Sequence, residues 1–154
     1  MTRKPRVLVS LCLLGVPCRY DGRPNGCEGL DALMARAELI PMCPEQLGGL
    51  PTPRVPAERR GDAVVTRDGR DVTTAFRRGA EAVCLLADRF NIRYALLKAR
   101  SPSCGGGEIY DGTFTGARVP GDGVTAEALK ARGVAVFTEQ TVDELIEKLE
   151  CDSI

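Results

Sequence analysis

Short apolar runs alternate with segments of helical periodicity along most of the chain, and this alternation limits the possible folds more than any other feature. Runs such as Arg6–Leu11 (RVLVSL) and Tyr94–Lys98 (YALLK) have the length and composition of buried strands. Between such runs, apolar residues recur at helical spacing, most clearly in Thr74–Asn91. Alternating strands and helices predict a parallel sheet with right-handed crossovers. We therefore expect an α/β chain with a Rossmann-like three-layer fold, a mostly parallel sheet and a single domain over residues 1–154.

The same patterns predict the remaining elements. We expect two more strands, at Leu39–Met42 and Val134–Phe137, and helices at Gly29–Ala37, Thr125–Arg132 and Thr141–Leu149. An Asp-Gly pair at positions 68–69 predicts a small hairpin with arms Ala63–Thr66 and Asp71–Thr73. Phe114–Val119 fits either a short strand or a loop.

The cysteine content points to thiol or metal chemistry. The 154 residues include seven cysteines and no histidine. We find no export signal, so we expect thiols or metal ligands rather than disulfides. Soft thiolate ligands favour zinc, Cu(I) and iron–sulfur clusters. Without histidine, acid–base chemistry must use carboxylates, hydroxyls, Lys, Cys or a metal.

Charge and hydropathy limit the possible partners. Twenty-one basic and 21 acidic residues give a net charge of zero, which argues against a nucleic-acid partner. No apolar run approaches the roughly 20 residues that span a bilayer, and the apolar start of the chain fits a strand better than a signal peptide. We therefore expect a cytoplasmic protein with neither nucleic-acid nor membrane partners. The sequence leaves the oligomeric state open.

Three cysteines each follow a predicted strand. Cys12 follows the first strand, Cys43 the second, and Cys104 lies in the Ser101–Gly107 segment (SPSCGGG) after the third. Ligands of such sheets bind beyond the carboxyl ends of the strands, whereas a core cysteine should lie within an element. We therefore expect the three to converge on one site, where glycines would let backbone N–H groups approach a cluster. The spacing matches neither a ferredoxin run nor a paired zinc site, and a flexible turn also explains the glycines.

The other cysteines are weaker candidates, except one. Cys18 shares a loop with Cys12 and could be a fourth ligand. A cluster with four cysteine ligands would suit electron transfer, whereas one with three leaves an iron free to act as a Lewis acid. We expect Cys84 in the core, Cys27 in a polar loop and Cys151 in the C-terminal tail.

Several polar side chains accompany these cysteines. Glu45 lies two residues after Cys43 and suits either acid–base chemistry or the start of a helix. Ser101 precedes a proline, where a turn hydroxyl is the more common role. Arg19 and Asp21, with the intervening tyrosine, could orient a planar substrate or staple the loop.

A proline-rich segment, Pro51–Pro56 (PTPRVP), predicts a rigid extended cover. Arg54 within it could point at the site.

Three motifs together resemble the thiouracil desulfidase (TudS) family, in order and over nearly the whole chain. They are SLCLLG with CRYDG (residues 10–15 and 18–22), CPE with GGLPTPR (43–45 and 48–54), and SPSCG (101–105). The resemblance implies a [4Fe–4S] cluster held by Cys12, Cys43 and Cys104, with one iron open to take sulfur from a thiolated nucleobase without net redox chemistry.

The resemblance also implies that Glu45 and Ser101 form the catalytic pair flanking the open iron. We assign Arg19, Asp21 and Ser103 to substrate binding. The expected function is conversion of a 2-thiouracil-like base to its oxo form and hydrogen sulfide. The alternatives are a redox or sulfur-carrier protein with a four-cysteine cluster, and a structural zinc domain.

Overall fold

A four-stranded parallel sheet forms the centre of the protein. The computed structural model describes residues 3–23 and 26–152. Its main sheet has the strand order β2 (Glu38–Met42), β1 (Arg6–Ser10), β5 (Tyr94–Leu97) and β8 (Ala135–Thr138), with every pair parallel. The apolar run predicted as the first strand is completely buried from Val7 to Val9 because β1 lies inside the sheet.

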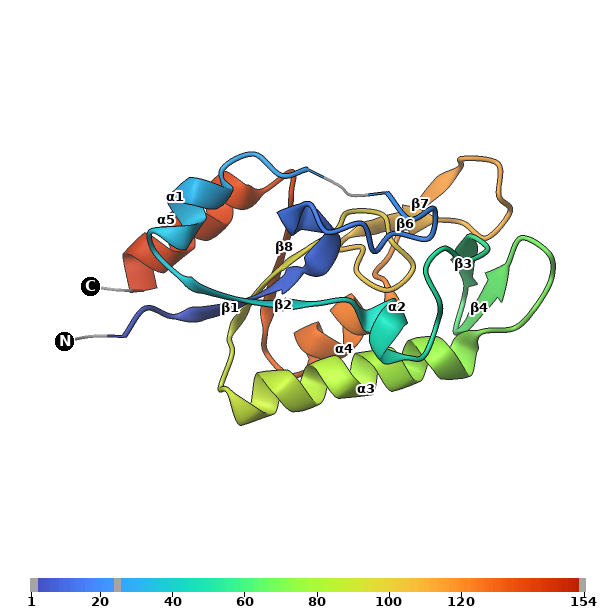
Figure 1. Cartoon of the computed structure of the whole chain (residues 1–154), viewed down its shortest axis with the longest axis horizontal. Helices are drawn as coiled ribbons and strands as arrows, with labels where there is room; N and C mark the ends of the chain where they lie inside the picture. The colour runs from blue at the N-terminus through green and yellow to red at the C-terminus, as the bar shows by residue number, and fades with distance from the viewer. Residues whose placement is uncertain (1–2, 24–25, 153–154) are drawn as a thin grey trace.

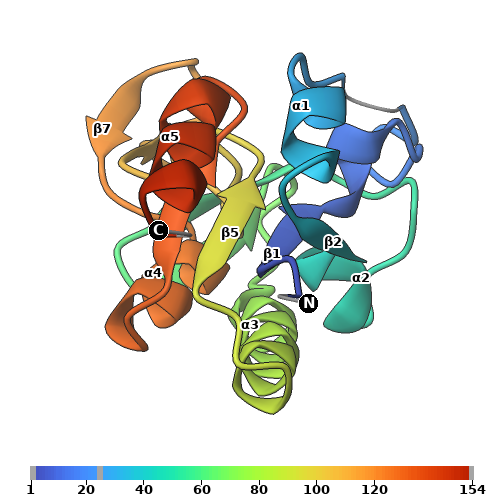
Figure 2. The same cartoon turned by 90° about the vertical axis from the view of Figure 1, so that its left-hand side faces the viewer.

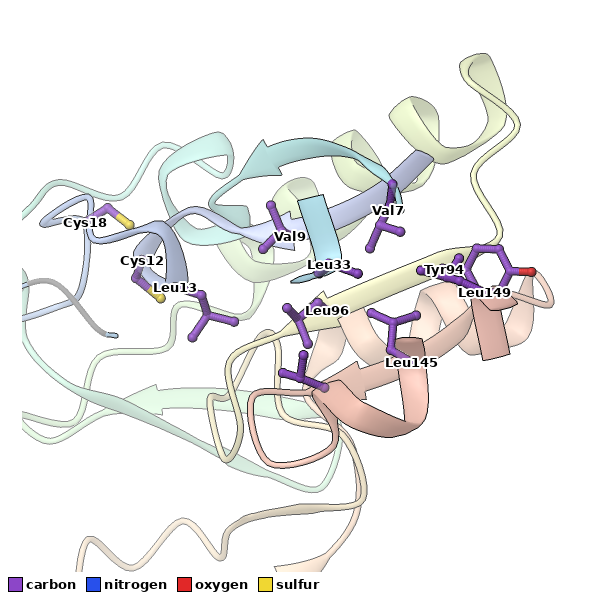
Figure 3. Packing of buried hydrophobic residues seen from close by; sticks show 12 residues of the cluster. Val7, Val9, Cys12, Leu13, Cys18, Leu33, Tyr94, Leu96, Leu145 and Leu149 are labelled. Atoms are coloured by element: carbon purple, nitrogen blue, oxygen red, sulfur yellow. The ribbon is translucent and has the colours of Figure 1, made fainter. Parts of the chain in front are cut away.

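Helices cover both faces of this sheet (Figures 1 and 2). On one side lie α1 (Leu30–Met34) and α5 (Val142–Asp152), and on the other lie α3 (Thr73–Arg89) and α4 (Val124–Ala131). Alternate residues of β1 enter opposite cores, as its pleat requires. Val7 and Val9 pack with Leu33, Leu96 and Leu145 (Figure 3), whereas Leu8 packs in the core under α3 and α4. The predicted α/β three-layer fold with a parallel sheet is confirmed.

Two small antiparallel sheets lie beyond the carboxyl ends of the main strands (Figure 1). One pairs β3 (Ala57–Arg60) with β4 (Ala63–Thr66), and the other pairs β6 (Glu108–Tyr110) with β7 (Arg118–Pro120). The second sheet divides the segment that was predicted as strand or loop, since Phe114 lies in the connection between its strands.

The predicted hairpin was wrong in one arm. β4 pairs with β3, which precedes it, whereas Asp71 forms only a single bridge to Val65. The Asp-Gly turn exists, but Asp71 Oδ1 accepts the N–H of Thr73, the first residue of α3. The segment predicted as the second arm therefore begins the long helix.

A short helix, α2 (Pro44–Leu47), follows β2 and packs on α3 at unusually close range. A Cβ on Gly48 would lie 2.0 Å from the carbonyl oxygen of Ala75, and one on Gly79 would lie 1.9 Å from that of Pro44. Only glycine permits this approach of two backbones. The contact fixes α2, and with it the start of the CPE motif, against the longest helix.

In the described part of the chain, none of the helices has the length and apolar character required to cross a membrane.

Candidate metal centre and active site

The three cysteines that follow strands line one cavity of about 400 Å³. Cys12 lies in the 3₁₀ helix η1 (Leu11–Leu14) directly after β1, Cys43 lies between β2 and α2, and Cys104 lies in the loop after β5. The parallel sheet brings them together because its three strands end at the same edge. The predicted convergence in space is therefore present, and their role as ligands stays a prediction.

Cys18 reaches the same cavity from the loop after η1 (Figure 3). Its thiol is buried and hydrogen-bonded to that of Cys43, and it also lies near Cys12. Burial, followed by the proximity of Cys43 and Cys12, raises the pKa of Cys18 to about 12. The thiol is therefore protonated at neutral pH unless a metal displaces the proton.

The other cysteines lie apart from this cavity. Cys84 is buried in the core on α3, as expected, and Cys151 is exposed near the end of α5. The Cys27 thiol donates a hydrogen bond to the Glu28 carbonyl.

Glu45 lies in the first turn of α2 and is held through both carboxylate oxygens. Arg54 Nε donates to Oε1 at 3.0 Å, and Ser103 Oγ donates to Oε2 at 3.0 Å. Ser103 Oγ in turn lies 3.0 Å from Ser101 Oγ. Glu45 and Ser103 are 58 positions apart in sequence, and the sheet edge brings them into contact.

Arg54 lies in the cavity wall and joins three segments. Its side chain is 7% exposed, and its guanidinium also donates to the carbonyls of Cys18 and Pro51 and to Thr52 Oγ1. The proline-rich segment is thereby tied to the cysteine loop and to α2. A buried guanidinium with this many acceptors holds a carboxylate in one orientation.

The family model for 2-thiouracil desulfurase matches residues 7–141. The chain belongs to the 2-thiouracil desulfurase family. The resemblance expected from the three motifs is therefore confirmed.

Two relatives of this desulfurase family cover nearly the whole chain. Protein YbbK of Bacillus subtilis (strain 168), described as uncharacterized, is 39% identical over 150 residues, which are 91% of this chain and 99% of the relative. A solved structure described as the [4Fe-4S]-dependent thiouracil desulfidase TudS (DUF523Vcz) has 50% sequence identity and a TM-score of 0.90. The match covers 96% of this chain and 99% of that chain.

The donor set of this desulfurase chain fits an iron–sulfur cluster. Within residues 3–23 and 26–152, no three Cys, Asp or Glu side chains gather closely enough to hold one metal ion. A cubane has no such requirement, because each cysteine binds a different iron. Burial raises the pKa of the Cys104 thiol to about 12, against the hydrogen bonds from Ser10 and Ser103 that lower it. Those hydroxyls would stabilise the Cys104 sulfur as a thiolate ligand once iron has displaced its proton.

The assigned substrate-binding residues occupy different places. Arg19 lines the cavity and lies 3.6 Å from Asp21, whereas Asp21 is outside the lining and accepts the N–H of Arg23. Asp21 therefore staples its loop and acts on the cavity through Arg19. Ser103 lines the cavity, but it is 1% exposed and its hydroxyl contacts Glu45.

Sequence reasoning missed the outer wall of the cavity, which the small sheets provide. Phe114 lines this wall with a left-handed backbone (φ 58°), and the Arg67 guanidinium lies 5.6 Å from its ring centre. Glu58 Oε1 accepts the N–H groups of Gly112 and Phe114 and so holds the turn. Polar turn segments without periodicity gave no signal for this wall.

Proposed function

We propose that the chain is a [4Fe–4S]-dependent desulfidase that converts a thiolated nucleobase such as 2-thiouracil to its oxo base and hydrogen sulfide. The observation that carries the proposal is the convergence of Cys12, Cys43 and Cys104 with Glu45 and Ser101 on one cavity in a chain of this family. The fold, the family and the solved desulfidase at 50% identity all support it.

The three cysteines would hold the cluster by three of its irons. When bound, the cluster supplies a Lewis-acidic iron that attracts the thione sulfur and polarises the C–S bond. The cavity, with apolar and aromatic walls and few polar groups, suits a planar base.

Glu45 would act as the general base. Arg54 and Ser103 fix its carboxylate toward the cavity, where it can take a proton from the attacking water. Ser101 would donate a proton to the substrate ring. With no histidine in the chain, a positioned carboxylate is the leading candidate for this role.

Arg19, Asp21 and Ser103 would complete substrate binding. Arg19 faces the cavity, Asp21 orients it, and Ser103 acts from beneath through its neighbours. We further propose that the chain works as one desulfidase unit in the cytoplasm on a small molecule rather than on nucleic acid or at a membrane, since its net charge is zero.

Alanine substitutions of cysteines test the metal centre. Anaerobically purified protein should be brown and contain about four irons, as a cubane requires. Cys12→Ala, Cys43→Ala and Cys104→Ala should each lose the colour, whereas Cys84→Ala, a buried cysteine outside the cavity, should keep it.

Cys18→Ala separates an open cluster from a closed one. We expect the colour and iron of this variant to persist, because three ligands suffice. Loss of iron in Cys18→Ala and in Cys12→Ala alike would favour the four-cysteine redox protein. Stoichiometric zinc in place of iron would refute the proposal altogether.

A further inference from the structure

We infer that Ser103 relays a proton between Glu45 and Ser101, so that the base and the acid of the reaction form one connected unit. The inference rests on the function proposed above and goes beyond it, because it couples the two groups through a third residue. The structure contains the complete path, from Glu45 Oε2 through Ser103 Oγ to Ser101 Oγ, with both steps 3.0 Å long.

The hydrogen bonds around Ser101 determine the direction of this path. Ser101 Oγ accepts the backbone N–H of Ser103 at 3.2 Å and that of Cys104 at 3.1 Å. A hydroxyl has two lone pairs and one proton, so Ser101 is left to act as the donor toward Ser103. Ser103 then donates to Glu45 Oε2 in preference to the Cys104 sulfur, which lies at 3.6 Å. The hydroxyl protons of the resting chain therefore all point toward Glu45.

The path is anchored and shielded from solvent. Arg54 binds the other oxygen of Glu45, so Oε2 remains aimed at Ser103. Ser103 is 1% exposed and Glu45 is 15% exposed, so bulk water has little access to the middle of the path. A buried serine between two partners, with a freely rotating hydroxyl, is suited to passing a proton from one to the other.

The relay satisfies the proton balance of the reaction. Replacing C=S by C=O consumes one water and releases hydrogen sulfide, with no net electron transfer. As the C–O bond forms, Glu45 takes one proton from water and passes it to Ser103, and the Ser103 proton moves to Ser101. Ser101 gives its own proton to the substrate ring, and both water protons end on the sulfide when the C–S bond has broken.

The test compares Ser103→Ala with a matched control, Thr125→Val. The Thr125 hydroxyl is also buried, makes no hydrogen bond within the described residues, and belongs to a residue whose N–H donates to the Ser103 carbonyl. Each anaerobic protein is assayed for iron, for binding of 2-thiouracil by equilibrium dialysis, and for kcat and KM. We expect Ser103→Ala to keep its iron, its binding and its KM within about twofold, and to lose about 10- to 100-fold in kcat. Ser103→Thr should recover much of the rate, and Thr125→Val should match the unsubstituted enzyme.

A second measurement needs no substitution. Single-turnover rates of the unsubstituted enzyme in H₂O–D₂O mixtures should vary nonlinearly with the deuterium fraction, because several protons move together. A linear dependence would overturn the relay, even if Ser103→Ala failed to fold. An unchanged kcat in Ser103→Ala, beside an inactive Glu45→Gln, would overturn the relay and leave the desulfidase function intact. An unsubstituted, iron-loaded enzyme that did not convert 2-thiouracil would instead overturn the proposed function for that substrate.

Discussion

Replacing Arg54 by methionine should be among the most destabilising single changes on the cavity wall. The guanidinium is 7% exposed and its partner Glu45 is 15% exposed, so both charges are largely removed from water. Breaking such a pair by removing one partner typically costs about 3–5 kcal/mol, because the remaining charge stays buried. Arg54 also donates to the carbonyls of Cys18 and Pro51, so two further acceptors lose their donor. We therefore expect the free energy of unfolding to fall by at least about 3 kcal/mol in Arg54→Met.

Urea denaturation followed by circular dichroism measures this loss, with all variants at matched iron content. The control is Arg70→Met, which breaks a pair with Asp68 whose side chains are 65% and 50% exposed. Such surface pairs contribute at most about 1 kcal/mol. In the double variant with Glu45→Gln, part of the loss should return, since no unpaired carboxylate remains, and the coupling should reach about 2 kcal/mol. A cost in Arg54→Met no larger than in Arg70→Met would refute the reasoning.

Two further changes test the fold around the site. Gly79→Ala should destabilise the protein by about 2 kcal/mol or more and reduce iron content, because the new Cβ would lie 1.9 Å from the Pro44 carbonyl; Gly26→Ala, which meets nothing within 4 Å, should do neither in the same urea and iron assays. Burial, followed by the hydrogen bond to Asp152, raises the pKa of Tyr94 from 10.0 to about 12, so its contribution is complete below pH 10 and is lost as the pH rises to 12. Urea midpoints measured over that range should therefore fall less steeply in Tyr94→Phe than in the unsubstituted protein.

The main sheet and the convergence of cysteines were predictable because both follow from local patterns. An apolar run such as RVLVSL marks a buried strand, and the rule for parallel sheets then gathers whatever follows each strand. Cys12, Cys43 and Cys104 reach the same cavity for this reason. Their spacing alone matched no known metal motif.

The outer wall and the carboxylate network were not predictable, because they depend on contacts between distant segments. Two turn sequences flank Ala63–Thr66, and the pairing with Ala57–Arg60 was selected only in the fold, where Asp71 begins α3 instead. The position of Ser103 against Glu45 likewise arises from two loops that meet only when the sheet has formed. A sequence pattern contains no information on such a contact.

Sulfide and uracil production from 2-thiouracil tests the central claim most directly. The account predicts that anaerobic, iron-loaded protein releases one sulfide for each uracil formed, without any added reductant or oxidant. Glu45→Gln, which keeps the size of the side chain but cannot take a proton, should bind the base at the same iron content and turn over about 10²-fold more slowly or worse. Failure of the loaded protein to form uracil, or a requirement for an electron donor, would contradict the account.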